Sequence, residues 1–424
     1  MVPRPRGHGD GAAEGVVTIP DRLLIVSPSY WPEPAGSAPM VTDLATGFAS
    51  AGCHTTVLTA RPYYPDLKVL DGYADGRLDS TEIEGVRIER LPTVPPKGGG
   101  MRARLVFESM LTLGVARALL GGRVDRHAAV LALCPSILMV MAAVGGRRRG
   151  GRLVVLVHDI QSGLAAALGM APGGARLAML RGLERAVLNR ADAVAVLSEP
   201  MRDVLRRLGV TVPIEVIPPH VDTDTIMPLE PTPDRPPTVL YSGAFARKQG
   251  LEQVLAMAAI LQGRRPEVPV ILRGGGPMEE GLRAMTAERG LANVTFRPLC
   301  PRDLLNEGLA EGDIHLVPQR PEGAAFAMPG KVVTILAAGR PLVATALPGG
   351  TLDRLAQATG AFLCVPPNEP EALARAVIAL IDDPERRRLM GHCGRAWVEA
   401  NASRRVVLER YARLLRTAEG SDAR

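Results

Sequence analysis

Short apolar segments typical of strands alternate with segments of helical periodicity along almost the whole chain, and this alternation restricts the possible folds most. The series opens with "RLLIVSPSY", the helical "MVTDLATGFASAG" and then "TTVLTA". The same order returns in "AAVLALCP", "RLVVLVHDI" and "AVAVLS". Strands that alternate with helices predict an α/β fold built on a doubly wound parallel sheet.

A proline-rich stretch at 217–238 divides the chain into two such series. A length of 424 residues is enough for two or three domains with separate cores. We expect a disordered extension at 1–20, a Rossmann-like domain at 21–220, a linker at 221–238 and a second Rossmann-like domain at 239–395. Two such domains would face each other across a cleft. Ligands bind beyond the carboxyl ends of parallel strands, so we expect the binding site in this cleft.

Composition excludes several classes of protein. The net charge of +6 is small for this length and only 3% of the residues are aromatic, so no nucleic-acid partner is expected. The five cysteines lie far apart, which fits neither a CxxC metal site nor a disulfide-rich secreted protein. Residues 1–20 contain no apolar signal segment. We therefore expect a cytoplasmic protein with reduced thiols.

The basic residues are concentrated between Lys97 and Arg152, where ten Lys and Arg stand against two acidic residues. The stretch at 101–120 has the periodicity of a helix with an apolar side, and "GGRRRGGR" follows further on. A basic, partly amphipathic region of this kind can bind the surface of an anionic bilayer. A core helix and a solvated Arg-rich turn explain the same pattern, so both interpretations stay open.

A series of ordered motifs resembles one enzyme family. "PEPAGSA" follows the first strand, "PYYP" the second, "HDI" a later one, "VIPPHVDT" opens the linker, and "GGGP" and "AAGRPLVAT" come in the second half. Together they resemble the glycosyltransferases of the GT-B fold, most of all the retaining family 4 of bacterial polysaccharide assembly, over about residues 21 to 415. The resemblance implies two facing Rossmann-like domains and a terminal helix at 396–424 that crosses back to the first domain.

The resemblance also implies the reaction. A hexosyl or N-acetylhexosaminyl group would pass from a nucleotide diphosphate, with a UDP-sugar expected, to an acceptor hydroxyl with retention of the anomeric configuration. The acceptor is expected to be a sugar or lipid-linked, at the inner face of the cytoplasmic membrane. The nucleotide sugar is a co-substrate, and no metal or other cofactor is expected.

Two loops of the second half carry the groups that a leaving diphosphate requires. Growing negative charge on the phosphates is stabilised by cations and backbone amides. "SGAFARKQGLEQVL" supplies Gly243 for close backbone approach and Arg247 and Lys248 for charge, before a helix expected to start near Gly250. "AMPGKVVTILAAG" places Lys331 in a turn just before another helix. We interpret Arg247, Lys248 and Lys331 as the catalytic cations.

Recognition of the rest of the donor is less complete. Many family members carry two glutamates before "LAAG", and here Thr334 stands at the second position, so Glu322 is the nearest acidic residue for the ribose or sugar. Gly275 lies in the glycine turn "RGGGP", and Arg297 ends the next strand where the family holds the base. A structural turn and a surface carboxylate are the alternatives for Gly275 and Glu322.

The first half supplies candidates for the sugar and the acceptor. Gly36 in "PEPAGSA" would let the first loop approach the substrate. His158 ends a buried strand, where the resemblance puts a catalytic imidazole near the transferred sugar. Asp159 and Glu33 are candidates for binding the acceptor hydroxyl. A dedicated protein base is not required, because an oxygen of the leaving phosphate can take the acceptor proton.

Two other functions stay open. The chain could be a transferase that glycosylates a small metabolite away from any membrane, or a nucleotide-sugar-binding subunit without activity, since the glutamate pair is missing. A dinucleotide-dependent dehydrogenase is the least expected alternative, because no GxGxxG follows the first strand. Asp222 and Asp224 form a DxD, but in the linker we expect an ordinary turn and no metal site.

Overall fold

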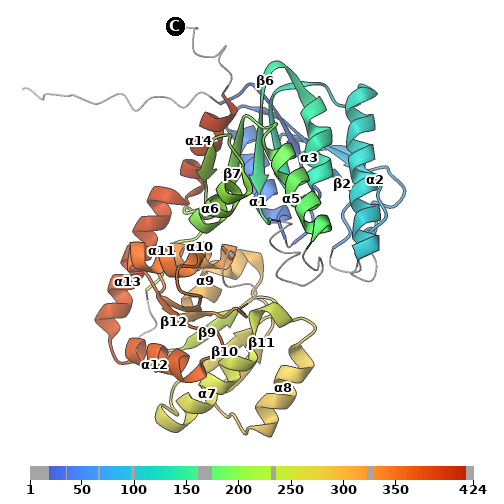
Figure 1. Ribbon diagram of the computed structural model, residues 1–424. Helices are drawn as coiled ribbons and strands as arrows, with labels where there is room; N and C mark the ends of the chain where they lie inside the picture. Colours follow the sequence, from blue (N-terminus) through green and yellow to red (C-terminus); the bar gives the residue numbers. More distant parts are fainter. Residues whose placement is uncertain are drawn as a thin grey trace, which may run out of the picture.

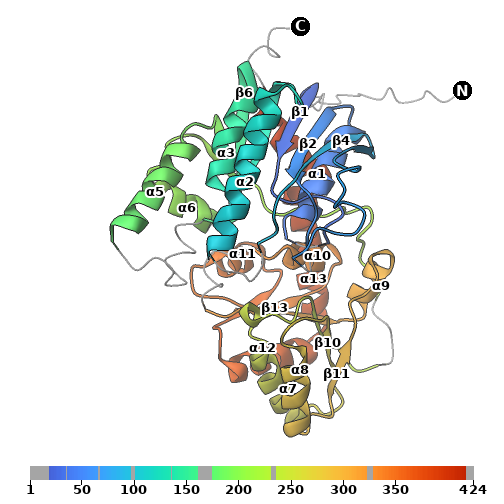
Figure 2. The same cartoon turned by 90° about the vertical axis from the view of Figure 1, so that its right-hand side faces the viewer.

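The computed structural model contains two α/β units, one above the other in Figure 1. It describes residues 19–34, 36–64, 67–96, 101–134, 136–160, 174–230, 235–321 and 328–416. Each unit is built on its own sheet, with helices on both faces (Figures 1 and 2). The GT-B architecture expected from the sequence is therefore present.

The first sheet has eight strands in the order β3-β4-β2-β1-β5-β6-β7-β8. All neighbouring strands are parallel except β3 and β4, which form an antiparallel edge hairpin that the sequence did not predict. Glu84 and Gly85, both with positive φ, make its two-residue turn. The strands are β1 (Arg22–Val26), β2 (His54–Ala60), β3 (Ser80–Ile83), β4 (Val86–Leu91), β5 (His127–Cys134), β6 (Arg147–Val157), β7 (Ala193–Val196) and β8 (Ile214–Val216).

The helices of this unit cover both faces of the sheet (Figures 1 and 2). On one face α2 packs against α3, α3 against α5, and α5 against α6, so that α2, α3 and α5 lie side by side (Figures 1 and 2). On the other face α1 packs against β2 and against the terminal helix α14 (Arg404–Leu415). The remaining bounds are α1 (Ala38–Ser50), α2 (Met101–Leu120), α3 (Ile137–Ala143), α5 (Ala175–Leu188) and α6 (Glu199–Leu208).

The arginine-rich "RRRGGR" is strand and not turn. It forms the first part of β6, which continues without a break into the buried Leu153–Val157. The register between β5 and β6 shifts between His127 and Ala129 to accommodate the extra length. These arginines therefore lie at the amino edge of the first sheet, which is the edge away from the second unit (Figure 1).

The second sheet has six parallel strands in the order β11-β10-β9-β12-β13-β14. The order reverses between β9 and β12, and ligands of doubly wound sheets bind at the carboxyl ends of the strands at such a switch point. The strands are β9 (Val239–Ser242), β10 (Val270–Arg273), β11 (Val294–Arg297), β12 (Ile314–Val317), β13 (Leu342–Thr345) and β14 (Leu363–Val365). The helices are α7 (Glu252–Arg264), α8 (Glu279–Glu288), α9 (Leu305–Ala310), α10 (Gly330–Ala337), α11 (Thr351–Thr359) and α12 (Pro370–Ile381).

The chain crosses between the units twice. The C-terminal crossing consists of two helices, α13 (Pro384–Asn401) and α14, where the sequence predicted one, because the chain leaves helical geometry at Ala402. Helix α14 is fixed to the first unit by Arg410, which donates to Glu215 over 2.8 Å. Residues 417–424 of the predicted helix lie outside the described part.

The two crossings are hydrogen-bonded to each other. The amide of Val221 in the linker donates to the carbonyl of Ala402 over 3.0 Å, and the amide of Arg404 donates to the carbonyl of Val221 over 3.0 Å. Close by, the Arg404 guanidinium lies 3.2 Å from the carboxylate of Asp43 in α1, and His220 Nε2 lies 2.6 Å from that carboxylate. Both crossings are thus held at one place on the first unit.

Candidate active site

Two glycine turns meet at the switch point of the second sheet. Gly243, directly after β9, has a φ of +146°, and Gly274, directly after β10, has a φ of +154°. A Cβ on Gly274 would lie 1.9 Å from the carbonyl oxygen of Gly243, so only glycine permits this approach. The amide of Phe245 donates to the carbonyl of Gly275 over 2.8 Å. The glycines therefore allow the two turns to pack against each other at the carboxyl ends of β9 and β10, beside the switch point.

Lys331 reaches the same point from the other side of the switch. It stands in the first turn of α10, which follows β12, and a Cβ on Gly243 would lie 2.5 Å from its Nζ. Among the described residues, this buried Nζ has no hydrogen-bond partner. Burial, and then the charge of Lys248, lower the pKa of Lys331 to about 8. A buried ammonium in the first turn of a helix is a place where an anion can bind.

The two other predicted cations lie on a short helix before α7. Arg247–Gln249 form the 3-10 helix η3, and α7 starts at Glu252, slightly later than expected. Both Arg247 and Lys248 are exposed. The charge of Lys248 contributes to the lowered pKa of Lys331, so Lys248 lies on the same side of the second unit as the Gly243–Lys331 contact.

The residues expected to bind the base and the ribose have partners of their own. Arg297 forms an ion pair with Glu311, which also binds Arg273. The hydroxyl of Thr334 donates to the carbonyl of Gly330 within α10 over 3.3 Å. Glu322 lies outside the described residues.

His158 follows directly after β6, whose carboxyl end points towards the second unit (Figure 1). Its Nε2 is buried and has no hydrogen-bond partner among the described residues. Burial lowers its pKa to about 4, against a smaller opposite effect of Asp159, which is exposed. The imidazole is therefore neutral near pH 7 and can bond a sugar hydroxyl.

The loop candidates of the first unit have structural tasks that the sequence did not reveal. The buried carboxylate of Glu33 accepts hydrogen bonds from the amides of Tyr63 at 2.9 Å and Tyr64 at 3.0 Å, and so joins the "PEP" loop to the "PYYP" loop. Burial raises the pKa of Glu33, while these two bonds lower it. Gly36 has a φ of +70°, but a Cβ there would meet nothing within 4 Å. Its backbone conformation explains the glycine better than a close approach does.

The DxD of the linker forms a turn, as expected. The Asp222 carboxylate accepts from the amides of Asp224 at 2.9 Å and Thr225 at 3.3 Å. Burial alone would raise its pKa, but these bonds bring it below the usual range. In the described part of the chain, no three His, Cys, Asp or Glu side chains gather as a metal site.

Tyr241 is the residue of this site that sequence reasoning missed. It lies in β9, fully buried, with its ring centroid 4.3 Å from Lys331 Nζ. An apolar strand context such as "VLYSG" favours a core position for a tyrosine, so the local sequence gave no reason to single it out. Only 3% of the residues are aromatic, and this scarcity was the one reason to consider each tyrosine individually.

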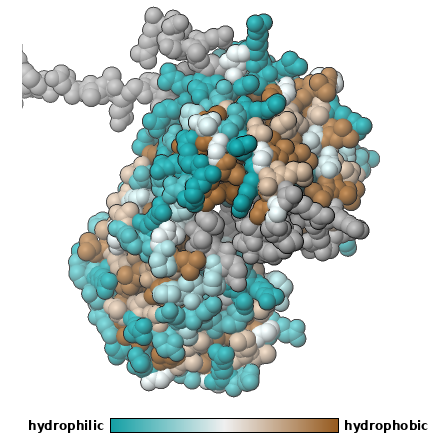
Figure 3. Space-filling model, viewed as in Figure 1, coloured by the Kyte–Doolittle hydropathy of each residue, from teal (hydrophilic) through white to brown (hydrophobic). Residues whose placement is uncertain are grey.

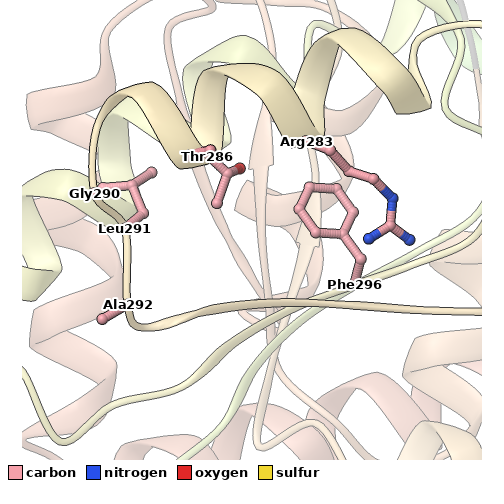
Figure 4. Close-up of a pocket in the computed structure, with 7 residues that line it drawn as sticks. Arg283, Thr286, Gly290, Leu291, Ala292 and Phe296 are labelled. Carbon is pink, nitrogen blue, oxygen red and sulfur yellow. The ribbon is translucent and has the colours of Figure 1, made fainter.

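Other hollows lie apart from this group. A shallow one of about 440 Å³ lies between α8 and β11, where the Arg283 guanidinium stands 4.5 Å above the Phe296 ring (Figure 4). A smaller one of about 230 Å³ lies between the units, beside the ion pair of Arg354 with Asp203 at 3.1 Å. None of the candidate residues named from the sequence lines either hollow.

Two family models match consecutive parts of the chain. Residues 35–220 match the glycosyl transferase 4-like domain, and residues 222–397 match the glycosyl transferases group 1. The putative colanic acid biosynthesis glycosyl transferase WcaI of Escherichia coli K12 is 28% identical over 373 residues, which cover 84% of this chain and 91% of that protein. The GDP-mannose-dependent alpha-(1-6)-phosphatidylinositol monomannoside mannosyltransferase of Mycolicibacterium smegmatis is 30% identical over 285 residues, or 63% of this chain and 71% of that protein.

Solved structures show the same fold. Sucrose-phosphate synthase from Thermosynechococcus elongatus superposes with a TM-score of 0.70 at 20% identity, covering 93% of this chain and 98% of that chain. HepE from Anabaena, in complex with UDP and glucose, has a TM-score of 0.66 at 17% identity, with 93% and 98% covered. The chain belongs to the GT-B glycosyltransferases, with a glycosyl transferase 4-like domain before a group 1 domain, and transfers sugar from a nucleotide sugar.

Proposed function

We propose that this protein is a retaining glycosyltransferase that moves a hexosyl or N-acetylhexosaminyl group to a lipid-linked acceptor in cell-surface polysaccharide assembly, without a metal ion. The observation that carries the donor site is the buried, unpartnered ammonium of Lys331 beside Gly243 at the switch point. A diphosphate bound there would supply the partner that Nζ lacks among the described residues.

The reaction breaks the bond between the anomeric carbon and the diphosphate oxygen, and the electron pair stays on the diphosphate. Lys331, the first amides of α10 and the more exposed Lys248 stabilise that charge. With a pKa of about 8, Lys331 is mostly protonated at pH 7 and suited to this role. Arg247 lies on the same short helix and is available from the solvent side.

Retention requires the acceptor hydroxyl to attack from the face that the diphosphate leaves. The new bond forms to the anomeric carbon, and the hydroxyl proton passes to an oxygen of the leaving phosphate. His158, neutral near pH 7, would bond a hydroxyl of the transferred sugar, and exposed Asp159 is placed to contact the acceptor. Arg297 would bind the base after releasing Glu311.

The donor is a nucleoside diphosphate sugar, and two bases, uracil and guanine, are candidates. The motifs favour a UDP-sugar, whereas the mycobacterial relative is named as GDP-mannose-dependent. Calorimetric titration with UDP, GDP and ADP, each with and without EDTA, identifies the base. Transfer from UDP-glucose or GDP-mannose to a lipid-linked monosaccharide, with NMR of the product, tests the activity and the anomeric configuration.

The test has clear outcomes. Binding of one nucleotide in EDTA, transfer with retention, and loss of both in Lys331→Met with smaller loss in Lys331→Arg would support the proposal. Binding without transfer or donor hydrolysis would favour an inactive nucleotide-sugar-binding subunit. Binding that Lys331→Met leaves unchanged would contradict the site.

An apolar surface on the first unit supports the proposed membrane location. Large side chains are exposed on the adjacent helices α2, α3 and α5, and brown atoms gather there in Figure 3. We call them the outer apolar face: Leu105, Val106, Met110, Leu113, Leu138, Met141, Met179 and Leu183. On the described parts of these helices, the exposed charged side chains are arginines: Arg117, Arg181 and Arg185. An exposed apolar patch with basic side chains fits an anionic bilayer surface at the cytoplasmic face.

Peripheral binding would suffice for this location. Within the described ranges, no helix combines the length and apolar character needed to cross a bilayer. Sedimentation with anionic and with neutral vesicles separates this proposal from a transferase that acts on a small metabolite. Absence from both vesicle types at low salt would contradict the membrane proposal.

A further inference from the structure

Tyr241 makes two contacts that join the two parts of the proposed donor site, the turn after β9 and Lys331 in α10. Its ring lies under the Lys331 ammonium, with Nζ 4.3 Å from the ring centroid. Its hydroxyl donates to the carbonyl oxygen of Ala244 over 2.7 Å, one residue beyond Gly243. One fully buried side chain therefore touches both the cation and the backbone of the turn.

The choice of an aromatic partner has a chemical consequence. The face of an aromatic ring attracts an ammonium ion without neutralising it. A carboxylate in the same place would compete with a diphosphate for the charge and for the N–H donors. The ring leaves those donors free, in agreement with the absence of a hydrogen-bond partner for Nζ among the described residues.

We propose that Tyr241 is a positioning residue for donor binding, whose ring holds Lys331 Nζ charged beside Gly243 while its hydroxyl fixes the backbone of the turn. This inference rests on the proposed role of Lys331 in diphosphate binding. Tyr241 itself touches neither the sugar nor the phosphates, because it is covered by the turn and by Lys331.

The groups around Lys331 determine its pKa. From η3, Lys248 acts on it and lowers its pKa, and burial lowers the pKa further. From β9, the Tyr241 phenol stays neutral, since burial raises its pKa well above the working range. Removal of the ring takes away an attraction for the charged form, so the pKa of Lys331 should fall.

The chain offers a direct measurement because it contains only four lysines, Lys68, Lys97, Lys248 and Lys331. Lysine labelled with ¹³C at the ε position gives four NMR signals in the full-length protein, and Lys331→Arg assigns one of them. In the wild type this signal should titrate near 8. In Tyr241→Leu it should titrate roughly half to one pH unit lower, and in Tyr241→Phe, which keeps the ring, it should stay near the wild-type value.

Nucleotide binding gives a second readout. A pKa lowered by about one unit reduces the charged fraction of Lys331 about fivefold at pH 8 and hardly at pH 6. Tyr241→Leu should therefore lose about fivefold more affinity for the preferred nucleotide at pH 8 than at pH 6. Tyr241→Phe lacks only the bond to Ala244, so its loss should be the same at both pH values.

Tyr411→Leu is the matched control. Tyr411 is also a fully buried tyrosine, but it lies in α14 on the other unit. The same substitution there should leave the titration of Lys331 unchanged. If Tyr241→Leu does not fold, pentafluorophenylalanine in place of Tyr241 keeps the ring shape while it reverses the attraction for a cation.

The titration and the binding test separate two failures. A Lys331 signal that stays in place or moves upward when the ring is removed overturns the role of Tyr241, whatever Lys331 binds. A signal that moves downward while Lys331→Met binds nucleotide as the wild type does overturns the role in donor binding together with the proposed diphosphate site.

Discussion

The Gly243→Ala substitution tests the proposed diphosphate site at Gly243 and Lys331 most directly. Gly243 has a φ of +146°, a conformation that residues with a Cβ rarely adopt. The new Cβ would lie 2.5 Å from Lys331 Nζ, 3.3 Å from its Cε and 3.4 Å from the Tyr241 hydroxyl. The Lys331 side chain is flexible and can make room for the new Cβ. To do so it must move its ammonium away from the place where we expect the diphosphate.

The magnitude follows from two costs. Backbone strain in a rarely populated region costs about 1–3 kcal/mol and lowers stability. A charge-assisted hydrogen bond to the displaced ammonium is worth about 1.5–3 kcal/mol, which corresponds to roughly 10- to 150-fold in Kd. We therefore expect nucleotide affinity to fall by about one to two orders of magnitude in a protein that still folds.

Calorimetric titration with the preferred nucleotide measures this loss, and thermal unfolding measures the strain. Gly263→Ala in α7 is the control, because a Cβ there meets nothing within 4 Å. It should bind as the wild type does and gain about 0.5–1 kcal/mol of stability. A folded Gly243→Ala protein with wild-type affinity would refute the placement of the diphosphate beside Gly243.

Four further predictions address the charge of Lys331, the membrane and the crossing between the units. Nucleotide binding above pH 8 should take up a proton on Lys331, whose pKa of about 8 a bound anion raises, and equal binding enthalpies in two buffers of different ionisation enthalpy would contradict this. Without ligand, the lowered pKa makes the folded protein gain stability as pH rises from about 8 towards 10.5, measurable by denaturant unfolding. Leu113→Glu in the outer apolar face should reduce sedimentation with anionic vesicles severalfold, whereas Leu389→Glu, similarly exposed in α13, should not. Arg404→Ala removes the contacts with Asp43 and should cost about 1–2 kcal/mol in unfolding experiments, and an unchanged midpoint would show that these contacts do not stabilise the fold.

The sequence predicted the fold because strand and helix patterns are local. Apolar runs of the length of β9 and β12 mark strands wherever they stand, and the loops after them are the places for ligands in a doubly wound sheet. That reasoning selected Gly243 and Lys331, which the structure brings together although 88 positions separate them. Their selection depended on loop position, residue type and the family resemblance, from which both loops were expected to bind the same diphosphate.

Contacts that depend on the register of distant segments could not be predicted in this way. Glu33 bonds to the backbone of Tyr63 and Tyr64, and no pattern around Glu33 distinguishes that task from binding an acceptor. Tyr241 lies in a strand whose local sequence indicates only burial. The arginines at the start of β6 were ambiguous because the glycines beside them favour turns, and only pairing with β5 makes this segment a strand.

The bonds between Val221 and the segment from Ala402 to Arg404 determine how the two units can move. The units also touch between α6 and α11, where the Thr351 hydroxyl donates to the Ser198 hydroxyl over 3.1 Å and Arg354 lies 3.1 Å from Asp203. A rotation of the units about the junction at Val221 would keep the backbone bonds of the crossings but would separate these side chains. Opening on the side remote from α13 and α14 would therefore break side-chain contacts only, and the route of the chain between the units would not change (Figure 1).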